Sequence, residues 1–278
     1  MIAMPMFWRR FGRNRLAVLG VVFLAFVVVL ALAAPLLFPG DPFRLVDKPF
    51  QRPFGTHLFG TDSLGRDIAA GIAHGARTSL LVGLVATVVA VTIGTVLGAC
   101  AGFYRGFVDE ALMRFTEFFQ TIPTFIFAIV LVAVLSPSKR SIIVAITVVS
   151  WPPIARLVRG ECMALREREF VQASICLGVR DRTIIFREIL PNVLSPVIVA
   201  GSLMVATAIL MEAALAFLGL GDPNAMSWGF MIGAGRSFLR DAWWLCAIPG
   251  VMILLTVLSI NLAGEGLNDA LNARLRTV

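Results

Sequence analysis

Residues 16–40 read LAVLGVVFLAFVVVLALAAPLLFPG, a stretch without a single charged side chain. A helix needs roughly 17–25 apolar residues to cross the hydrocarbon core of a bilayer, so this stretch predicts a transmembrane helix. Uncharged runs recur five more times along the chain. They lie at Thr78–Tyr104, Phe118–Ser138, Ser141–Ala155, Ile189–Met211 and Ala242–Gly264. We therefore expect an all-α membrane protein with six transmembrane helices.

Two of these predicted spans extend beyond their uncharged cores. The fourth core is short, but it continues through Leu157 and Val158 when Arg156 reaches the interface by snorkelling. The fifth continues past Glu212 to Leu218. A transmembrane β-barrel is disfavoured, because barrel strands alternate apolar and polar residues and these runs do not.

The composition agrees with a chain that is largely embedded in lipid. Of the 278 residues, 58% are hydrophobic and 15% are charged, whereas a soluble domain carries about 25% charged residues. A net charge of +7 would suggest a nucleic-acid partner for a soluble protein. Here we expect no such partner, because arginines beside membrane spans set topology instead. The four cysteines lack metal-ligand spacing and are expected to be free thiols.

The distribution of basic residues orients the predicted helices. Four arginines precede the first span and place the N-terminus in the cytoplasm: Arg9, Arg10, Arg13 and Arg15. Six spans bring the C-terminus to the same side, and the predicted cytoplasmic segments then hold 15 basic residues against 9 outside. We expect a cytoplasmic segment 1–15 and a transmembrane domain 16–278. A signal peptide cleaved near Ala33 is disfavoured, because the first run exceeds the roughly 7–15 residues of such segments.

Two soluble segments interrupt the spans. The outer one, about 41–77, carries proline, glycine and mixed charge, and the inner one, about 160–190, is the most densely charged part of the chain. In the inner segment, residues 170–177 are predicted to form a short helix that stops at Gly178.

Further backbone signals follow this short helix or lie within the spans. A second helix is predicted to begin at Asp181 or Thr183, and Pro191 is expected to end it before the fifth span. Small residues repeat in the second span and predict a close helix–helix approach: Gly94, Gly98 and Gly102.

The inner segment resembles the EAA signature of ABC importer permeases, which reads E-A-A, three residues, G, nine residues, I-x-L-P. Here Gln172-Ala173-Ser174 is followed by Gly178 and Ile189-Leu190-Pro191. Gln172 replaces Glu, Ser174 replaces Ala, and the isoleucine lies one residue late, with Glu188 in its usual place. In that family the segment is the coupling helix, which inserts into a groove on the ATPase subunit. The resemblance assigns ATPase coupling to Phe170, Val171, Gln172, Ala173, Ser174, Leu177, Gly178, Arg180, Asp181 and Arg182.

Three other segments resemble the dipeptide, oligopeptide and nickel permeases. Residues 59–67 (FGTDSLGRD) are similar to L-G-T-D-x-x-G-R-D, residues 212–221 (EAALAFLGLG) to E-A-x-L-S-F-L-G-L-G, and residues 261–271 (NLAGEGLNDAL) to N-L-x-G-D-x-L-R-D-x-L. The first segment supplies the outer-loop motif, whose members are Gly60, Thr61, Asp62, Gly65, Arg66 and Asp67. Length and the first span indicate the shorter, C-type member of the permease pair.

The resemblance implies a type I ABC importer permease fold in a bacterial inner membrane. It implies three kinds of partner besides lipid: a homologous second permease, two ABC ATPases and an extracytoplasmic solute-binding protein. Di- and oligopeptides are the expected substrates, and nickel chelates are the alternative. A P-loop requires G-x-x-x-x-G-K-[ST], and neither Lys48 nor Lys139 lies in such a sequence. We therefore expect no enzyme activity, cofactor or metal here, with ATP and magnesium on the partner ATPases.

Glu212 is the one acid deep in a predicted span, and such a residue is a functional candidate by default. It either lines the pathway or accepts hydrogen bonds from a neighbouring helix. An ion-coupled secondary transporter using Glu212 is the competing class, but the inverted halves typical of such proteins are not visible in the sequence. His57 and His74 are expected to be exposed polar residues. The charged members of the outer-loop motif either pair internally or contact the binding protein.

Overall fold

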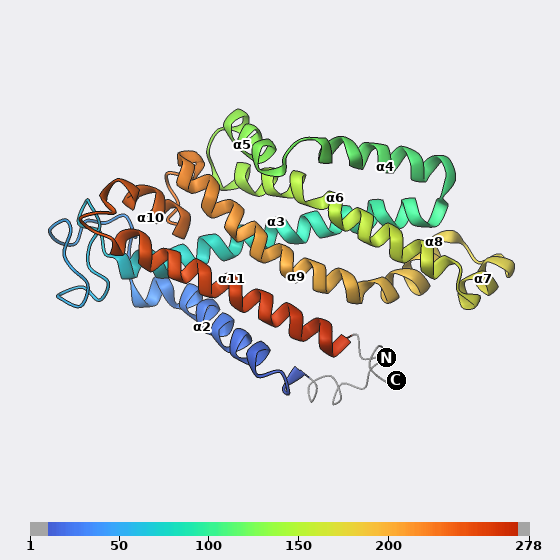
Figure 1. Cartoon of the computed structure of the whole chain (residues 1–278), viewed down its shortest axis with the longest axis horizontal. Helices are drawn as coiled ribbons and strands as arrows, with labels where there is room; N and C mark the ends of the chain where they lie inside the picture. The colour runs from blue at the N-terminus through green and yellow to red at the C-terminus, as the bar shows by residue number, and fades with distance from the viewer. Residues whose placement is uncertain (1–10, 272–278) are drawn as a thin grey trace.

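The structure is a computed structural model that describes residues 11–271, and these form a bundle of helices (Figure 1). Within the described part of the chain there are isolated β-bridges but no strands. The longer helices are α2 (Arg15–Leu37), α3 (Ile68–Tyr104), α4 (Gly106–Thr121), α5 (Thr124–Leu135), α6 (Lys139–Arg166), α9 (Leu190–Leu215) and α11 (Trp244–Leu271). The shorter ones are α7 (Glu169–Cys176), α8 (Asp181–Ile184), η1 (Ile185–Ile189), η2 (Ala216–Leu220), α10 (Trp228–Gly235) and η3 (Arg236–Phe238).

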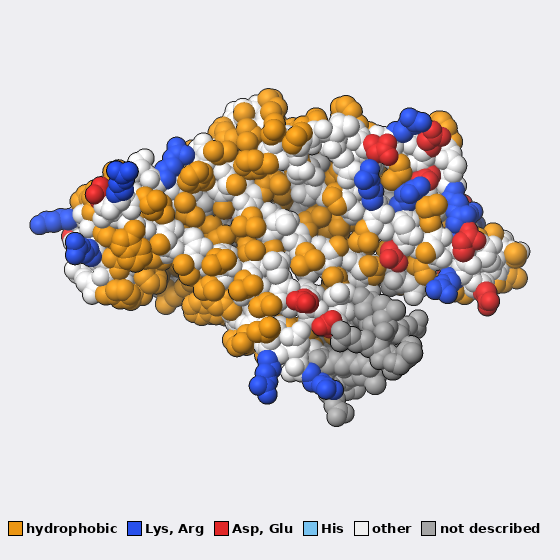
Figure 2. Space-filling view, in the orientation of Figure 1, with side chains coloured by type: hydrophobic (Ala, Val, Ile, Leu, Met, Phe, Trp, Pro, Cys, Tyr) orange, Lys and Arg blue, Asp and Glu red, His pale blue; other side chains and the backbone are white. Residues whose placement is uncertain are grey.

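The bundle has two chemically different ends. One end, here the loop end, carries residues 38–67 and α10, and the opposite end, here the α7 end, carries α7 and α8 (Figure 1). Hydrophobic side chains cover the middle of the visible face, while charged side chains gather toward the ends and beside the terminal residues (Figure 2). This apolar belt is what a multi-pass membrane protein requires.

Among residues 11–271, five helical stretches are long and apolar enough to cross a membrane, and a bent helix pair brings the number to six. The bent pair corrects the prediction of the third span as one helix over 118–138. The chain turns by 83° between α4 and α5, because Ile122 is extended before Pro123 (φ −90°, ψ 129°). α5 alone has 12 residues, about 18 Å of helix, so it spans only together with α4.

The other predicted spans are confirmed as helices, but their bounds move. α6 continues to Arg166, well beyond its uncharged core. α3 begins at Ile68, so that the last ten residues of the predicted outer segment 41–77 are helical. Asp67 explains this start, since its Oδ1 accepts the backbone N–H of Ala69 (2.8 Å) as an N-cap.

Pro191 does not end the helix before the fifth span, contrary to the sequence-based expectation. α8, η1 and α9 follow one another without a break, and η1 is a π-helical turn. The backbone N–H of Leu190 donates to the carbonyl of Ile185, five residues back. The wider turn accommodates Pro191, which has no N–H to donate to the helix ladder. The α7 end is therefore connected to the fifth span by continuous helix.

α3 and α6 form the closest helix pair of the bundle, as the glycine repeat predicts. A Cβ added to Gly94 would lie 2.7 Å from the carbonyl oxygen of Trp151, and one added to Gly102 would lie 2.6 Å from that of Arg159. A Cβ on Gly98 would overlap the carbonyl oxygen of Ala155. Small residues therefore let the two backbones touch, which replaces the hydrophobic driving force that is weak between helices in lipid.

We expect Gly98→Ala to lower the stability of the purified protein by about 1–3 kcal/mol, because the methyl group overpacks the α3–α6 contact. Gly160→Ala is the matched control, since a Cβ there meets nothing within 4 Å. Alanine favours helix over glycine, so the control is expected to be neutral or stabilising. Thermal unfolding in mild detergent measures both variants, and equal stability of Gly98→Ala and the parent chain would contradict the packing argument.

Candidate functional site

The candidate coupling helix is α7, an eight-residue helix at the α7 end with a defined stop. Gly178 has φ +72° and occupies the C′ position. The N–H of Gly178 donates to the carbonyl of Ile175 (3.0 Å), and the N–H of Val179 donates to that of Ser174 (3.1 Å). These two bonds form a Schellman motif, which needs a residue in the left-handed region. The prediction of a helix stopped by Gly178 is confirmed.

Polar contacts fix α7 to the two long helices beside it. The Nε2 of Gln172 donates to the carbonyl oxygen of Arg166 at the end of α6 (2.8 Å). The hydroxyl of Ser174 donates to Oε1 of Glu188 in η1 (2.7 Å). A glutamate at position 172 could not donate to a carbonyl while ionised. The departures from the EAA pattern are therefore the residues that anchor this helix.

One predicted docking residue belongs to the anchor instead. Val171 is fully buried and packs in a cluster with Val158 of α6, Ile184 of α8 and Ile189 of η1. The resemblance assigns Val171 to ATPase coupling, but its side chain packs inside the chain and is not available to a partner surface. The sequence spacing alone did not reveal this, because α7 is too short for its apolar residues to define one face.

The opposite face of α7 is apolar and open. Leu177 is 81% exposed and Phe170 is 46% exposed, so two large apolar side chains lie on the surface at this end of the bundle. The remaining predicted coupling residues on this surface are also exposed: Ala173, Arg180, Asp181 and Arg182. The exposed apolar side chains of α7 are thus bordered by charged side chains. This arrangement is typical of a protein–protein interface.

Glu212 is 2% exposed and does not line an open path through the described chain. Its Oε2 accepts a hydrogen bond from the hydroxyl of Ser79 in α3 (3.1 Å). The same hydroxyl lies 3.4 Å from the backbone nitrogen of Trp228, whose indole N–H donates to the carbonyl of Ile72 (3.0 Å). Of the two roles left open, acceptance of a hydrogen bond where α3, α9 and α10 meet is the one that the geometry shows.

The outer-loop motif pairs internally. Oδ1 of Asp62 accepts the backbone N–H groups of Leu64 and Arg66 (2.8 Å each), and its Oδ2 lies 3.9 Å from Nε of Arg66. The hydroxyl of Thr61 donates to the carbonyl of Lys48 and accepts the N–H of Gln51. Of the two alternatives for the charged residues, internal pairing is therefore the one observed.

Both glycines of the motif are required by the backbone. Gly60 has φ +78° and Gly65 has φ +82°, and a Cβ on either would overlap a carbonyl oxygen of residues 47–51. His57 lies between Asp47 (3.5 Å) and Asp67 (3.7 Å), so it is not the exposed residue expected from the sequence. The N–H of Lys48 donates to Asp47 and lowers the pKa of that carboxyl group.

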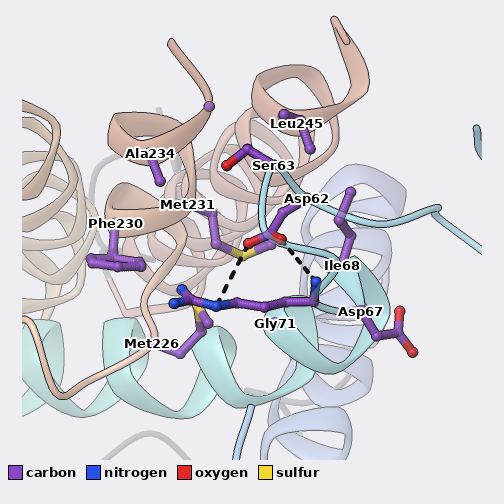
Figure 3. A pocket seen from close by; sticks show the side chains of 12 residues that line it. Asp62, Ser63, Asp67, Ile68, Gly71, Met226, Phe230, Met231, Ala234 and Leu245 are labelled. Atoms are coloured by element: carbon purple, nitrogen blue, oxygen red, sulfur yellow. Dashed lines mark hydrogen bonds and ion pairs between the residues drawn. The ribbon is translucent and has the colours of Figure 1, made fainter. Parts of the chain in front are cut away.

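A small cavity of about 30 Å³ lies between the outer-loop motif and α10. Asp62, Met226 and Met231 lie around it, together with Ile68 and Gly71 of α3 (Figure 3). Its volume suffices for roughly one or two water molecules. The motif therefore serves to seat the loop on the bundle, and this cavity is too small for an organic ligand.

Ion pairs between α4 and α6 were not foreseen from the sequence. The guanidinium of Arg159 binds both carboxylate oxygens of Asp109 in α4 (2.5 and 2.6 Å). Arg105, just before α4, pairs with Glu167 at the end of α6 (2.5 Å). Both pairs join residues more than 45 positions apart, and no local pattern announces such contacts. They hold α4 along α6 at the α7 end.

Family comparisons agree with this architecture. Residues 90–277 match the family described as binding-protein-dependent transport system inner membrane component. Residues 4–53 match the N-terminal transmembrane domain of oligopeptide transport permease C.

Individual relatives cover nearly the whole chain. A putative peptide transport system permease of Brucella abortus is 41% identical over 270 residues, which are 96% of this chain and 91% of that protein. A dipeptide transport system permease of Alkalihalophilus pseudofirmus is 39% identical, covering 97% and 90%. A glutathione transport system permease of Escherichia coli is 37% identical, covering 97% and 90%.

A solved structure shares the fold. A chain of the methionine ABC transporter, in an inward-facing conformation, superposes with a TM-score of 0.59 at 20% sequence identity. The match covers 72% of this chain and 96% of that chain. The fold expected from the sequence, a type I ABC importer permease, is thereby confirmed.

We expect Gly178→Val to loosen the end of α7, because a β-branched residue in the left-handed region costs at least about 1–2 kcal/mol. Amide hydrogen exchange over residues 173–179 should accelerate by roughly 5–30-fold. Gly178→Asn is the matched control, since asparagine tolerates this conformation. Unchanged exchange in the valine variant would show that the Schellman motif does not hold the helix.

Proposed function

The chain belongs to the family of binding-protein-dependent transport-system inner-membrane components, and from this we propose that it is the C-type permease subunit of an ATP-driven importer of di- and oligopeptides. The observation that carries the coupling role is α7, a rigid helix outside the apolar belt whose free face is apolar. A helix of this kind transmits motion as a rigid body when a partner grips it. ATP hydrolysis then takes place on separate subunits, in keeping with the absence of a P-loop.

The helix anchor supports a lever mechanism. Gln172 and Ser174 connect α7 to α6 and η1 by hydrogen bonds, and η1 continues into α9 without a break. A displacement of the ATPase surface would therefore move α6 and α9 together with α7. Phe170 and Leu177 would supply the apolar contacts, and Arg180, Asp181 and Arg182 would form the charged rim.

The partners and their sides follow from the same assignment. Two ABC ATPases would dock at the α7 end, which we place in the cytoplasm with both termini, and a solute-binding protein would dock at the loop end outside. A homologous second permease would pair with this chain in the lipid bilayer, and the translocation pathway would lie between the two. ATP and magnesium would be bound by the ATPases, and this chain would bind no cofactor or metal of its own.

Peptides are the substrate class that the relatives favour. Proteins about 40% identical over most of this chain are named as permeases for peptides and dipeptides, and one at 37% for glutathione, itself a short peptide. Nickel chelates are less well supported. Among residues 11–271, no group of three or more His, Cys, Asp or Glu side chains is arranged to hold a metal ion.

We expect Leu177→Asp to abolish ATPase binding and ATP-driven uptake, because it places a charge in the centre of the apolar docking face. Loss of one well-packed anchor weakens an interface by about 2 kcal/mol or more, roughly thirtyfold in affinity. The measurement is purification in mild detergent from native membranes, followed by mass spectrometry of the co-purifying subunits. The parent chain should recover a second permease and P-loop ATPases.

Leu36→Asp is the matched control, since Leu36 is similarly exposed (84%) but lies toward the loop end. This variant should retain the ATPases. Normal ATPase recovery with Leu177→Asp would refute the coupling role of α7. Recovery of the parent chain alone, with transport in liposomes that needs no ATP, would refute the importer assignment itself.

A further inference from the structure

A polar pocket lies at the loop end, where four segments distant in the sequence meet. Its volume is about 300 Å³, near the lower limit for pockets that bind small molecules. The start of the loop, the first turns of α3, the start of α6 and the residues before α10 contribute to its walls. The residues with polar side chains in the lining are Asp41, His74, Arg77, Thr78, Lys139 and Asn224.

Two cations in this lining are in no ion pair, although Asp41 lines the same pocket. Within residues 11–271, neither Arg77 nor Lys139 forms an ion pair. Asp222 lies beside Lys139, but its carboxylate is used by the backbone. Its Oδ2 accepts the N–H of Lys139 (3.0 Å) and its Oδ1 accepts the N–H of Asn224 (2.9 Å). The free guanidinium and ammonium groups therefore favour an anionic ligand, most of all a carboxylate or phosphate.

The walls of the pocket are held by contacts that do not involve its free charges. The ring of Phe43 packs under the guanidinium of Arg66 (4.9 Å) and edge-on against Phe230 (5.6 Å). Nε2 of His74 lies 3.1 Å from the carbonyl oxygen of Phe38. The contact between Asp222 and Lys139 fixes the start of α6 against the segment before α10. A pocket prepared in this way loses little conformational freedom when a ligand binds.

We propose that this pocket receives the free α-carboxylate of a short peptide as it enters the permease. Arg77 and Lys139 bind the carboxylate, and Asp41 on another wall faces the peptide's ammonium group. A peptide with free ends carries a carboxylate and an ammonium group, and the pocket carries two cations and one carboxylate. A phosphate headgroup would match the two cations only. This inference rests on the proposed function and adds a recognition site that lies on the permease itself.

The test is direct binding of L-alanyl-L-alanine and of its C-terminal amide to the assembled importer in lipid nanodiscs, without binding protein. Saturation-transfer NMR measures such weak affinities. The parent complex should bind the free acid about tenfold more tightly than the amide, as expected for a charge-assisted hydrogen bond. Arg77→Gln and Lys139→Gln should lower binding of the acid to the level of the amide and leave binding of the amide unchanged.

Arg140→Gln is the matched control. It removes the same charge from the residue next to Lys139, which is exposed and does not line the pocket. The control should keep the preference for the acid. Loss of that preference in Arg140→Gln, equal loss of acid and amide binding in Arg77→Gln, or no preference in the parent complex would each overturn the proposal.

A carboxylate from the binding protein is the competing ligand source. Arg77→Gln would then weaken the complex with ligand-free binding protein and leave the preference for alanylalanine as the free acid intact, which also overturns the proposal. ATP-driven peptide uptake by the parent importer is measured separately. Its absence would count against the proposed function, whereas the acid–amide comparison alone judges the pocket.

Discussion

Inside a lipid bilayer no water is present to pair with the backbone, so every N–H and C=O must find its partner within the protein. This constraint explains how the chain treats its prolines. Pro191 is the second residue of α9, which follows directly on a π-turn that keeps the helix continuous. Pro123, by contrast, stands at a complete break between α4 and α5. At the other end of α4, the ion pair of Asp109 with Arg159 holds this helix against α6.

The same constraint makes α7 useful. Because α8, η1 and α9 form one uninterrupted helical path, a force on α7 reaches the middle of the bundle without passing through a flexible loop. The connection is made by buried apolar contacts of Val171 and by two hydrogen bonds, from Gln172 and Ser174. The signature residues therefore position the helix, while the side chains of Phe170 and Leu177 face outward.

Features that depend on residues close together in the sequence were easier to predict than features that depend on residues far apart. Apolar runs and the Gly178 stop are local, and the six membrane segments and the end of α7 were predicted from them. The sequence left the role of Glu212 open and did not show that Val171 is buried, because the surroundings of both come from residues far away in sequence, such as Ser79 of α3 for the carboxylate. No local sequence pattern predicts the Asp109–Arg159 pair, because its two residues lie 50 positions apart. The fold was thus more predictable than the site.

The weak charge bias across the membrane has a structural explanation. Of the nine basic residues assigned to outer segments, Arg66 is fixed by Asp62 and Phe43 inside the loop. Arg77 and Lys139 line a pocket and form no ion pair within residues 11–271. In the proposed orientation these residues lie outside, although basic residues disfavour export of short loops. An anionic ligand in the proposed pocket would give Arg77 and Lys139 a role there.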